Sequence, residues 1–329
     1  MPADPAPSQP LASAPTPPAW FVRTAWGVLA YTIGVIVWGA FVRASKSGAG
    51  CGDHWPDCHG RIIPSFADTA TQIEYAHRLT SGLSGLLVLA LAVAAFFVTP
   101  RGHIVRRYAL LSGVFILSES VLGMLLVRFQ YVAADASVGR ALWMALHLVN
   151  TFLLLAWLGL TAWHGGGQPH APLRSSGALG KTMFVALGAA LLVATFGAQA
   201  ALADTLFPAA SLARGLAQDL TPGGHFLLRL RLLHPILAMT LAVYLVVAVT
   251  IASAARPTVA VKRASTLVFV LLTLQLAFGF VNLAFLAPVW MQLLHLFNAD
   301  LLWTTLVVLT AASIAAPAKR ALEAPSRGA

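Results

Sequence analysis

Long apolar runs separated by short polar segments dominate the chain. A bilayer core of about 30 Å requires about 20 apolar residues in one helix, and eight runs of the sequence reach that length. Their approximate limits are residues 22–42, 72–98, 108–127, 141–163, 182–203, 227–253, 264–286 and 289–315. A helix satisfies its backbone polar groups internally, as lipid requires. The pattern therefore predicts an all-α, polytopic membrane protein with eight transmembrane helices.

The composition agrees with this fold class. Hydrophobic residues make up 58% of the 329 residues and charged residues 10%, and the mean hydropathy is +0.79, which excludes a soluble domain. The first residues are rich in proline and show no apolar period, so we expect a disordered tail over residues 1–21 rather than a signal peptide. A second tail is expected over residues 316–329.

An even number of spans places both termini on one side of the membrane. The loops predicted on that side carry more lysine and arginine than the opposite loops, which predicts cytoplasmic termini in a cell (inner) membrane. The formal net charge is +10. Cytoplasmic loops that face anionic membrane lipid account for this charge, so no nucleic acid is expected as a partner.

The chain also repeats itself. Pairs of similar residues recur at a spacing of about 150 to 160 positions, and they are Gly39 with Gly197, His77 with His234, Gly123 with Gly279, and His147 with His295. Because four spans are an even number, both copies enter the membrane in the same sense. We therefore expect two parallel-repeat four-helix bundles, over residues 22–163 and 182–315, joined by a cytoplasmic linker over residues 164–181.

Four histidines lie at similar depths in four of the predicted helices: His77, His147, His234 and His295. A single membrane histidine is most simply a hydrogen-bonded packing residue. Four in a twofold repeat indicate a ligand instead, because ionisable rings inside a bilayer are costly. Two helices that each offer one imidazole across a bundle core can hold a haem between axial nitrogens. The predicted pairs are His77 with His147 and His234 with His295.

Other residues near the same ends of the helices suggest further chemistry. Arginines that could bind haem propionates, or simply mark the membrane boundary, are Arg43, Arg128, Arg140, Arg229 and Arg231. Glu74 and His77 have the glutamate-x-x-histidine spacing of di-iron bundles, but such sites need that motif twice. Glu74 could instead take up a proton or stabilise developing positive charge, or be an interfacial residue at a helix N-terminus.

The only two cysteines, Cys51 and Cys58, lie in the first outward loop. An oxidising compartment would let them form a disulfide. A metal site with His54 and His59 is the alternative, although the gap between the cysteines differs from that of structural zinc sites, and free thiols are a third. The sequence leaves a structural and a redox role for a disulfide equally open.

Several segments resemble the haem A synthase family, in its cysteine-containing subgroup. They are Phe41-Val-Arg43-Ala-Ser-Lys-Ser-Gly48, the loop from Cys51 to Cys58, Glu74-Tyr-Ala-His77-Arg78, His147-Leu-Val-Asn150-Thr and Leu294-His295-Leu-Phe-Asn-Ala-Asp300. The resemblance extends from about residue 25 to 315. One departure is Pro235, which follows His234 where many members have arginine. A proline inside a helix favours a local kink.

The resemblance implies an oxidoreductase that converts a methyl group of haem O to a formyl group and so yields haem A for cytochrome oxidase assembly. It implies that His77 and His147 bind the iron of the substrate haem and that His234 and His295 bind a haem b cofactor. Glu74, Cys51 and Cys58 are expected to be catalytic, with the two cysteines joined in a disulfide.

The same resemblance implies a haem O synthase as donor of the substrate, contact with membrane lipid and an electron acceptor of unknown identity. Homo-oligomer formation is left open.

The alternative functions are a diheme b-type membrane electron carrier and a transporter without chemistry. An electron carrier would keep the four histidines but would have no use for Glu74 or the cysteine pair.

Overall fold

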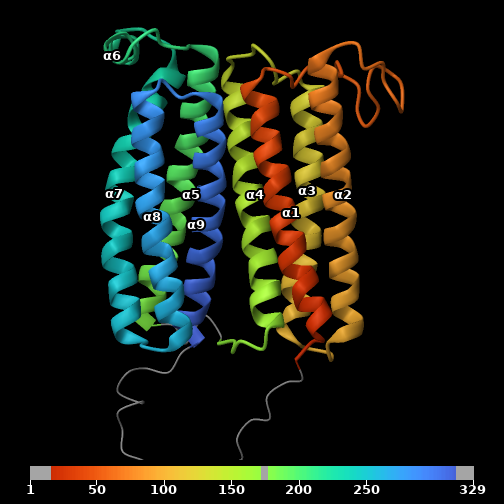
Figure 1. Cartoon of the computed structure of the whole chain (residues 1–329), viewed down its shortest axis with the longest axis vertical. Helices are drawn as coiled ribbons and strands as arrows, with labels where there is room; N and C mark the ends of the chain where they lie inside the picture. The colour runs from red at the N-terminus through yellow and green to blue at the C-terminus, as the bar shows by residue number, and fades with distance from the viewer. Residues whose placement is uncertain (1–15, 172–176, 316–329) are drawn as a thin grey trace, which may run out of the picture.

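A computed structural model describes residues 16–171 and 177–315. Within these residues the regular secondary structure is all α-helix, apart from an isolated bridge in the first loop. Eight of the helices are long and apolar enough to cross a membrane. The helices are α1 (Ala19–Ala44), α2 (Thr69–Val98), α3 (Ile104–Arg128), α4 (Val138–Gly165), α5 (Gly177–Leu206), α6 (Leu212–Leu220), α7 (Phe226–Ala255), α8 (Val259–Ala284) and α9 (Val289–Ala315). The predicted all-α membrane fold is confirmed (Figure 1).

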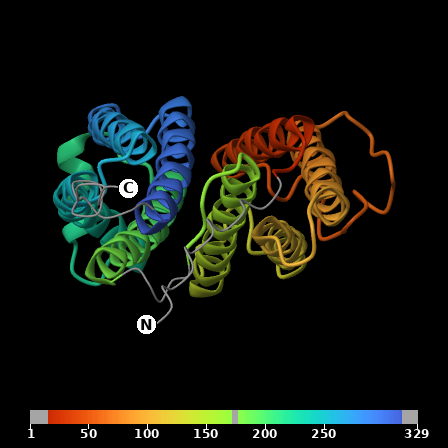
Figure 2. The ribbon, with the colours of Figure 1, turned by 90° about the horizontal axis from the view of Figure 1, so that it is seen from below.

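The eight long helices form two groups of four. Helices α1–α4 make one group, and α5 with α7–α9 makes the other (Figure 2). The groups meet where α4 contacts α5 and α9, and where α1 contacts α9. Helices α1 and α5 both begin at the face where α9 ends (Figure 1), as a parallel repeat requires. We call this the terminal face, and the opposite face the histidine face.

Seven of the eight spans begin before the limit that hydropathy predicts, and polar caps mark several of these starts. Asp68 accepts a hydrogen bond from the Thr71 backbone amide at the start of α2, and Ser137 caps α4 in the same way through the Arg140 amide. Such caps satisfy amide groups that the first turn leaves without partners. The apolar pattern that predicts the spans does not include these polar capping residues. Helix α7 continues through Pro235.

The predicted tails and linker need correction at their edges. Helix α1 begins at Ala19, inside the tail predicted over residues 1–21, and the rest of that tail up to residue 15 lies outside the described residues, as does the tail over 316–329. The linker predicted over 164–181 is shorter, because α4 continues to Gly165 and α5 begins at Gly177.

The sequence analysis missed one helix, α6, on the histidine face between α5 and α7. Ser211 caps it by accepting from the Arg214 amide. It is short and amphipathic rather than uniformly apolar, so a search for membrane spans passes over it. Its Asp219 accepts hydrogen bonds from Arg231 of α7 at 2.6 and 2.9 Å, which ties the helix to the bundle.

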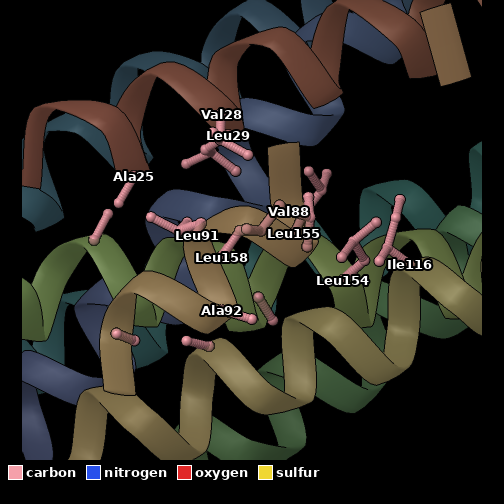
Figure 3. Close-up of a cluster of buried hydrophobic side chains, with 14 of the residues drawn as sticks. Ala25, Val28, Leu29, Val88, Leu91, Ala92, Ile116, Leu154, Leu155 and Leu158 are labelled. Atoms are coloured by element: carbon pink, nitrogen blue, oxygen red, sulfur yellow. The ribbon is translucent and has the colours of Figure 1, made fainter. Parts of the chain in front are cut away.

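A buried apolar cluster holds the first group of helices together. Figure 3 shows Leu29 of α1, Val88 of α2, Ile116 of α3 and Leu155 of α4 within this cluster. Large apolar side chains are also abundant on the outer surface of the bundle, where Phe97 of α2 is 84% exposed. Such exposure suits helices surrounded by lipid, which is as apolar as the interior.

Candidate functional site

Each of the four predicted histidines faces a glycine on the neighbouring helix. A Cβ added to Gly39 of α1 would lie 2.9 Å from Cε1 of His77 in α2, and one added to Gly197 of α5 would lie 2.8 Å from Cε1 of His234 in α7. The other two pairs are Gly123 with His147, at 3.8 Å, and Gly279 with His295, at 3.5 Å. A Cβ would clash with the ring at Gly39 and Gly197 and would make ordinary contact at Gly123 and Gly279. The sequence repeat therefore reflects a repeated helix contact, and it is closest in the first pair of each half.

In the second half, the two histidines that the sequence paired lie close to each other. The ring centroids of His234 and His295 are 6.5 Å apart, with the planes at 88°. Two imidazoles that share one metal ion through bonds of about 2 Å would have centroids roughly 6 Å apart.

The histidines also have ring nitrogens that need a partner. Nδ1 of His77, His147, His234 and His295 is buried in each case, without a hydrogen bond inside the described ranges. A buried polar atom left unpaired costs about 1 to 3 kcal/mol. If a haem iron bonded to each imidazole, the ring could turn so that one of its nitrogens binds the iron and the other donates to a protein acceptor. The residues present therefore fit a haem in each half.

A duplicated hydrogen-bond network supports one histidine in each half. Asn150, three residues after His147, donates to Glu119 Oε2 at 2.6 Å, and Glu119 Oε1 lies 3.5 Å from His147 Nδ1. In the second half, Asn298 donates to Gln275 Oε1 at 2.6 Å, and Gln275 Nε2 lies 3.1 Å from His295 Nε2. The two networks are alike in placement and differ in charge.

The sequence analysis assigned no role to Glu119 or Gln275. The histidine-x-x-asparagine spacing, seen in both His147 with Asn150 and His295 with Asn298, was the signal that could have found the network. A side chain three residues after a histidine lies on nearly the same helix face, so both residues of each motif meet the same neighbouring helix.

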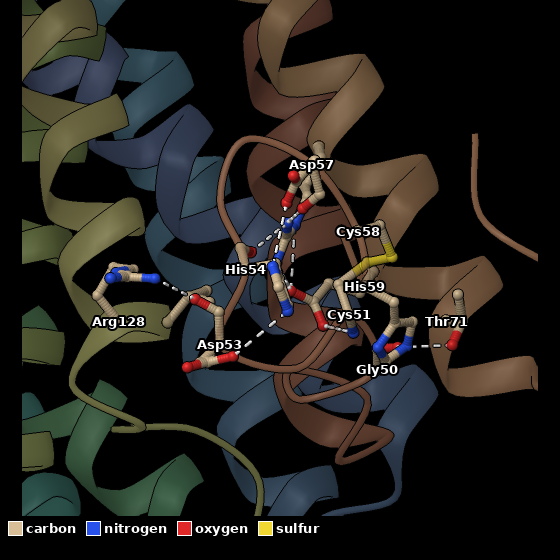
Figure 4. A network of polar contacts seen from close by, with 12 residues as sticks. Gly50, Cys51, Asp53, His54, Asp57, Cys58, His59, Thr71 and Arg128 are labelled. Atoms are coloured by element: carbon tan, nitrogen blue, oxygen red, sulfur yellow. Dashed lines mark hydrogen bonds and ion pairs between the residues drawn. A yellow bond between two sulfur atoms is a disulfide. The ribbon is translucent and has the colours of Figure 1, made fainter. Parts of the chain in front are cut away.

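The first loop on the histidine face is closed by a disulfide between Cys51 and Cys58. Figure 4 shows His54, Asp53 and Asp57 gathered in this loop, where His54 lies 3.5 Å from Asp57 and 3.8 Å from Asp53. Because both sulfurs are bonded to each other, the alternatives of a metal site with His54 and His59 and of free thiols are not met. Across the described ranges, no group of three or more histidine, cysteine, aspartate or glutamate residues is placed to hold a metal ion.

Glu74 and Arg78 fasten this loop to α2. Glu74 is buried, and its Oε2 accepts from the Cys51 backbone amide at 2.9 Å while its Oε1 accepts from Arg78 at 2.5 Å. Arg78 also donates to the carbonyls of His54 and Asp57, at 2.8 and 2.5 Å. Glu74 is therefore a buried, ion-paired residue near the start of α2, in contact with the loop.

Four of the five arginines considered for propionates already have protein partners. Arg128 donates to the Asp53 carbonyl and Arg140 to the carbonyls of Ala133 and Asp135. Arg231 pairs with Asp204 and Asp219. Arg229 is exposed. Of the five arginines it alone has no such bond within the described residues.

Arg43 joins the two halves of the molecule. From α1 it donates to the Ala201 carbonyl and the Thr205 hydroxyl of α5, at 2.6 and 2.7 Å, and to Gln292 Oε1 of α9, at 3.0 Å. A guanidinium with several acceptors loses less on burial than an unpaired charge. Arg43 therefore fixes the first half against the second at the histidine face.

Comparison with known proteins identifies the family of this chain. The family described as cytochrome oxidase assembly protein matches residues 22–307, which include all four histidines and the disulfide loop. The chain belongs to this family. The match also covers both four-helix groups, so the assignment concerns the whole membrane-spanning part.

Relatives of this cytochrome oxidase assembly protein carry two different names. A "Protoheme IX farnesyltransferase" of Thermus thermophilus is 44% identical over 305 residues, which are 92% of this chain and 50% of the relative. A "Heme A synthase" of an Exiguobacterium species is 42% identical over 89 residues, 27% of this chain and 30% of the relative. One of Bacillus pumilus is 40% identical over 114 residues, 34% of each chain. The chain thus spans about half the length of the Thermus relative.

Proposed function

We propose that this chain is a haem A synthase, which oxidises a methyl group of haem O to a formyl group. The single observation that carries the proposal is the duplicated pair of partly buried histidines, each facing a glycine and each with a buried ring nitrogen that has no hydrogen bond within the described residues. The assignment to the cytochrome oxidase assembly protein family and the partial matches to heme A synthases support it.

In this proposal the two halves have different tasks. His77 and His147 hold the substrate haem O, and His234 and His295 hold a resident haem b. The electrostatics of the halves favour this division, because Glu119 beside His147 carries an acidic group where Gln275 beside His295 is neutral. A carboxylate next to an imidazole stabilises developing positive charge on it, which suits the half where oxidation occurs.

The chain's own residues would bind, orient and shield the substrate. The glycines at the histidines admit the flat rings closely, and the Asn150–Glu119 contact orients His147. Glu74 lies one helical turn before His77 and holds the disulfide loop over this end of α2, where it could accept a proton from the oxidised group. A bound haem b would supply a redox group that carries electrons away from the first site.

The name of the Thermus relatives suggests a second function, prenyl transfer to a haem. Transfer from a prenyl diphosphate requires groups that hold the diphosphate, usually a divalent cation bound by carboxylates. The described residues hold no cluster of three or more candidate ligands. The match covers only half of that relative, so its name is explained if the unmatched half performs the transfer. We therefore favour the oxidation.

Pigment analysis tests the proposed function. The protein is produced in a host that makes haem b but neither haem O nor haem A, with and without supplied haem O, and the haems extracted from the purified protein are separated by chromatography. We expect haem b in both cases and haem A only with haem O. Haem b alone would indicate an electron carrier, no pigment a transporter, and haem O formed without supply a farnesyltransferase.

Exchange of the acidic group beside His147 tests the division between halves. Glu119→Leu removes the acceptor of Asn150 and the contact with His147, and such losses around a metal-binding histidine lower affinity about 10- to 100-fold. We expect haem O retention to fall while the haem b content stays constant. Gln275→Leu is the matched control and should lower haem b instead; equal effects of both variants on both haems would contradict the division.

A further inference from the structure

An apolar groove separates the two halves near the terminal face. Helix α1 leans away from α9 toward that face (Figure 1), and the space between them holds a groove of about 710 Å³. Its walls include Trp26 and Ile33 of α1, Leu267 of α8, and Val308 of α9. Trp26 and Leu267 are 41% and 48% exposed. These walls belong to helices long and apolar enough to span a membrane, so we expect lipid rather than water around the groove.

Few polar side chains line the groove. Thr304 and Thr305 line it, but their hydroxyls donate to carbonyls of their own helix, so they offer little to a polar ligand. Gln168 and Arg263 lie near the terminal face instead. Arg263 is exposed and takes no part in the ion pairs found among the described residues. The groove is thus apolar inside and cationic at its mouth.

The charge around the mouth is not neutralised by nearby carboxylates. In the described ranges, every acidic residue lies on the histidine face or inside the bundle, at Asp53, Asp57, Asp68, Glu74, Glu119, Asp135, Asp204, Asp219 and Asp300. The cations of the terminal face are Arg23, Arg101, Arg106, Arg107, Lys181, Arg256, Lys262 and Arg263. Among the described residues of the terminal face, the charges near an anionic ligand at Arg263 are therefore all positive.

We propose that this groove is a binding site for an anionic phospholipid of the leaflet at the terminal face. An acyl chain would fill the apolar space between α1, α8 and α9, and the phosphate would lie at Arg263 and Gln168. Basic pockets between membrane-spanning helices recognise anionic headgroups in this way. The volume suits a chain of lipid size, and the bound lipid would hold the diverging ends of the two halves together. The proposal does not depend on the haem chemistry.

Native mass spectrometry of the purified protein in detergent tests the site. The protein is mixed with equal amounts of phosphatidylglycerol and phosphatidylcholine, and the lipid that stays bound is measured. We expect the wild type to retain phosphatidylglycerol preferentially and Arg263→Gln to lower that retention about fivefold. Arg107→Gln is the matched control, since Arg107 is exposed on the same face but does not line the groove.

A second pair of variants tests the apolar part. Ala30→Phe fills the groove from α1 and should lower retention of both lipids, whereas Ala90→Phe on the surface of α2 should leave retention unchanged. Inorganic phosphate should not displace the lipid. Equal retention of the two lipids by the wild type, equal losses in Arg263→Gln and Arg107→Gln, or displacement by phosphate would overturn the proposal.

Circular dichroism and size-exclusion chromatography show whether each variant is folded. Arg263→Lys provides a further check, because it preserves the charge and should keep the preference for phosphatidylglycerol. Loss of that preference in a folded Arg263→Lys protein would contradict a site based on charge and also count against the proposal.

Discussion

Replacing His234 or His295 with alanine is expected to remove the absorption spectrum of the resident haem b. Their ring centroids are 6.5 Å apart, and loss of either histidine would leave the iron of the proposed haem with a single axial imidazole in a lipid-surrounded bundle. We expect purified variants to lose about one haem per chain, because axial ligation is the main bond between haem and protein. Haem extracted from equal amounts of protein measures the loss.

His170→Ala is the matched control for these variants. His170 lies in the exposed segment after α4, away from the four glycine-facing histidines, so its loss should leave both haems in place. His77→Ala and His147→Ala should reduce bound haem O while the haem b spectrum persists. An unchanged spectrum in folded His234→Ala and His295→Ala proteins would refute bis-histidine ligation in the second half.

Substitution of Glu74 should produce the second large effect, a loss of haem A formation without a loss of haem b. Removing a group that transfers protons typically lowers a rate by about 10²-fold or more. Glu74→Ala and Glu74→Gln should both show this loss, because neither side chain can take up a proton as a carboxylate does. The ratio of haem A to haem O in extracts, with the haem b spectrum as reference, measures it.

A structural role for Glu74 predicts a different pattern. Glu74 also accepts hydrogen bonds from Cys51 and Arg78, and glutamine keeps an acceptor for them. Arg78→Met removes the partner and its contacts with the His54 and Asp57 carbonyls while leaving the carboxylate. We expect Arg78→Met to be milder than Glu74→Gln. A nearly active Glu74→Gln protein, or an Arg78→Met protein as inactive as Glu74→Ala, would show that Glu74 acts only by holding the loop.

The duplicated architecture explains how one fold can serve two chemically different sites. The glycine–histidine contacts are repeated in both halves, so both offer the same kind of cradle. The surroundings differ, since Glu119 and the disulfide loop belong to the first half and Gln275 and α6 to the second. Arg43 fixes the halves against each other near the histidines, which keeps the two sites at a constant separation.

Much of this molecule was predictable from local patterns in the chain. Apolar runs of membrane length determined the eight spans, because lipid permits few other structures. The repeat then placed the four histidines in two pairs, since equivalent positions in repeated helices lie at equivalent depths. The loop cysteines, Cys51 and Cys58, are close in sequence, and the disulfide was the favoured of their three alternatives.

Contacts between distant helices were decided only by the tertiary structure. Arg43 donates to α5 and α9 instead of remaining free to bind a propionate. This depends on how the halves pack, and no local pattern contains that information. The same holds for Asn150 with Glu119, for the anchoring of α6 through Asp219, and for the groove beside Arg263. Hydropathy determines which segments enter the membrane, whereas side-chain packing between those segments determines which polar groups meet.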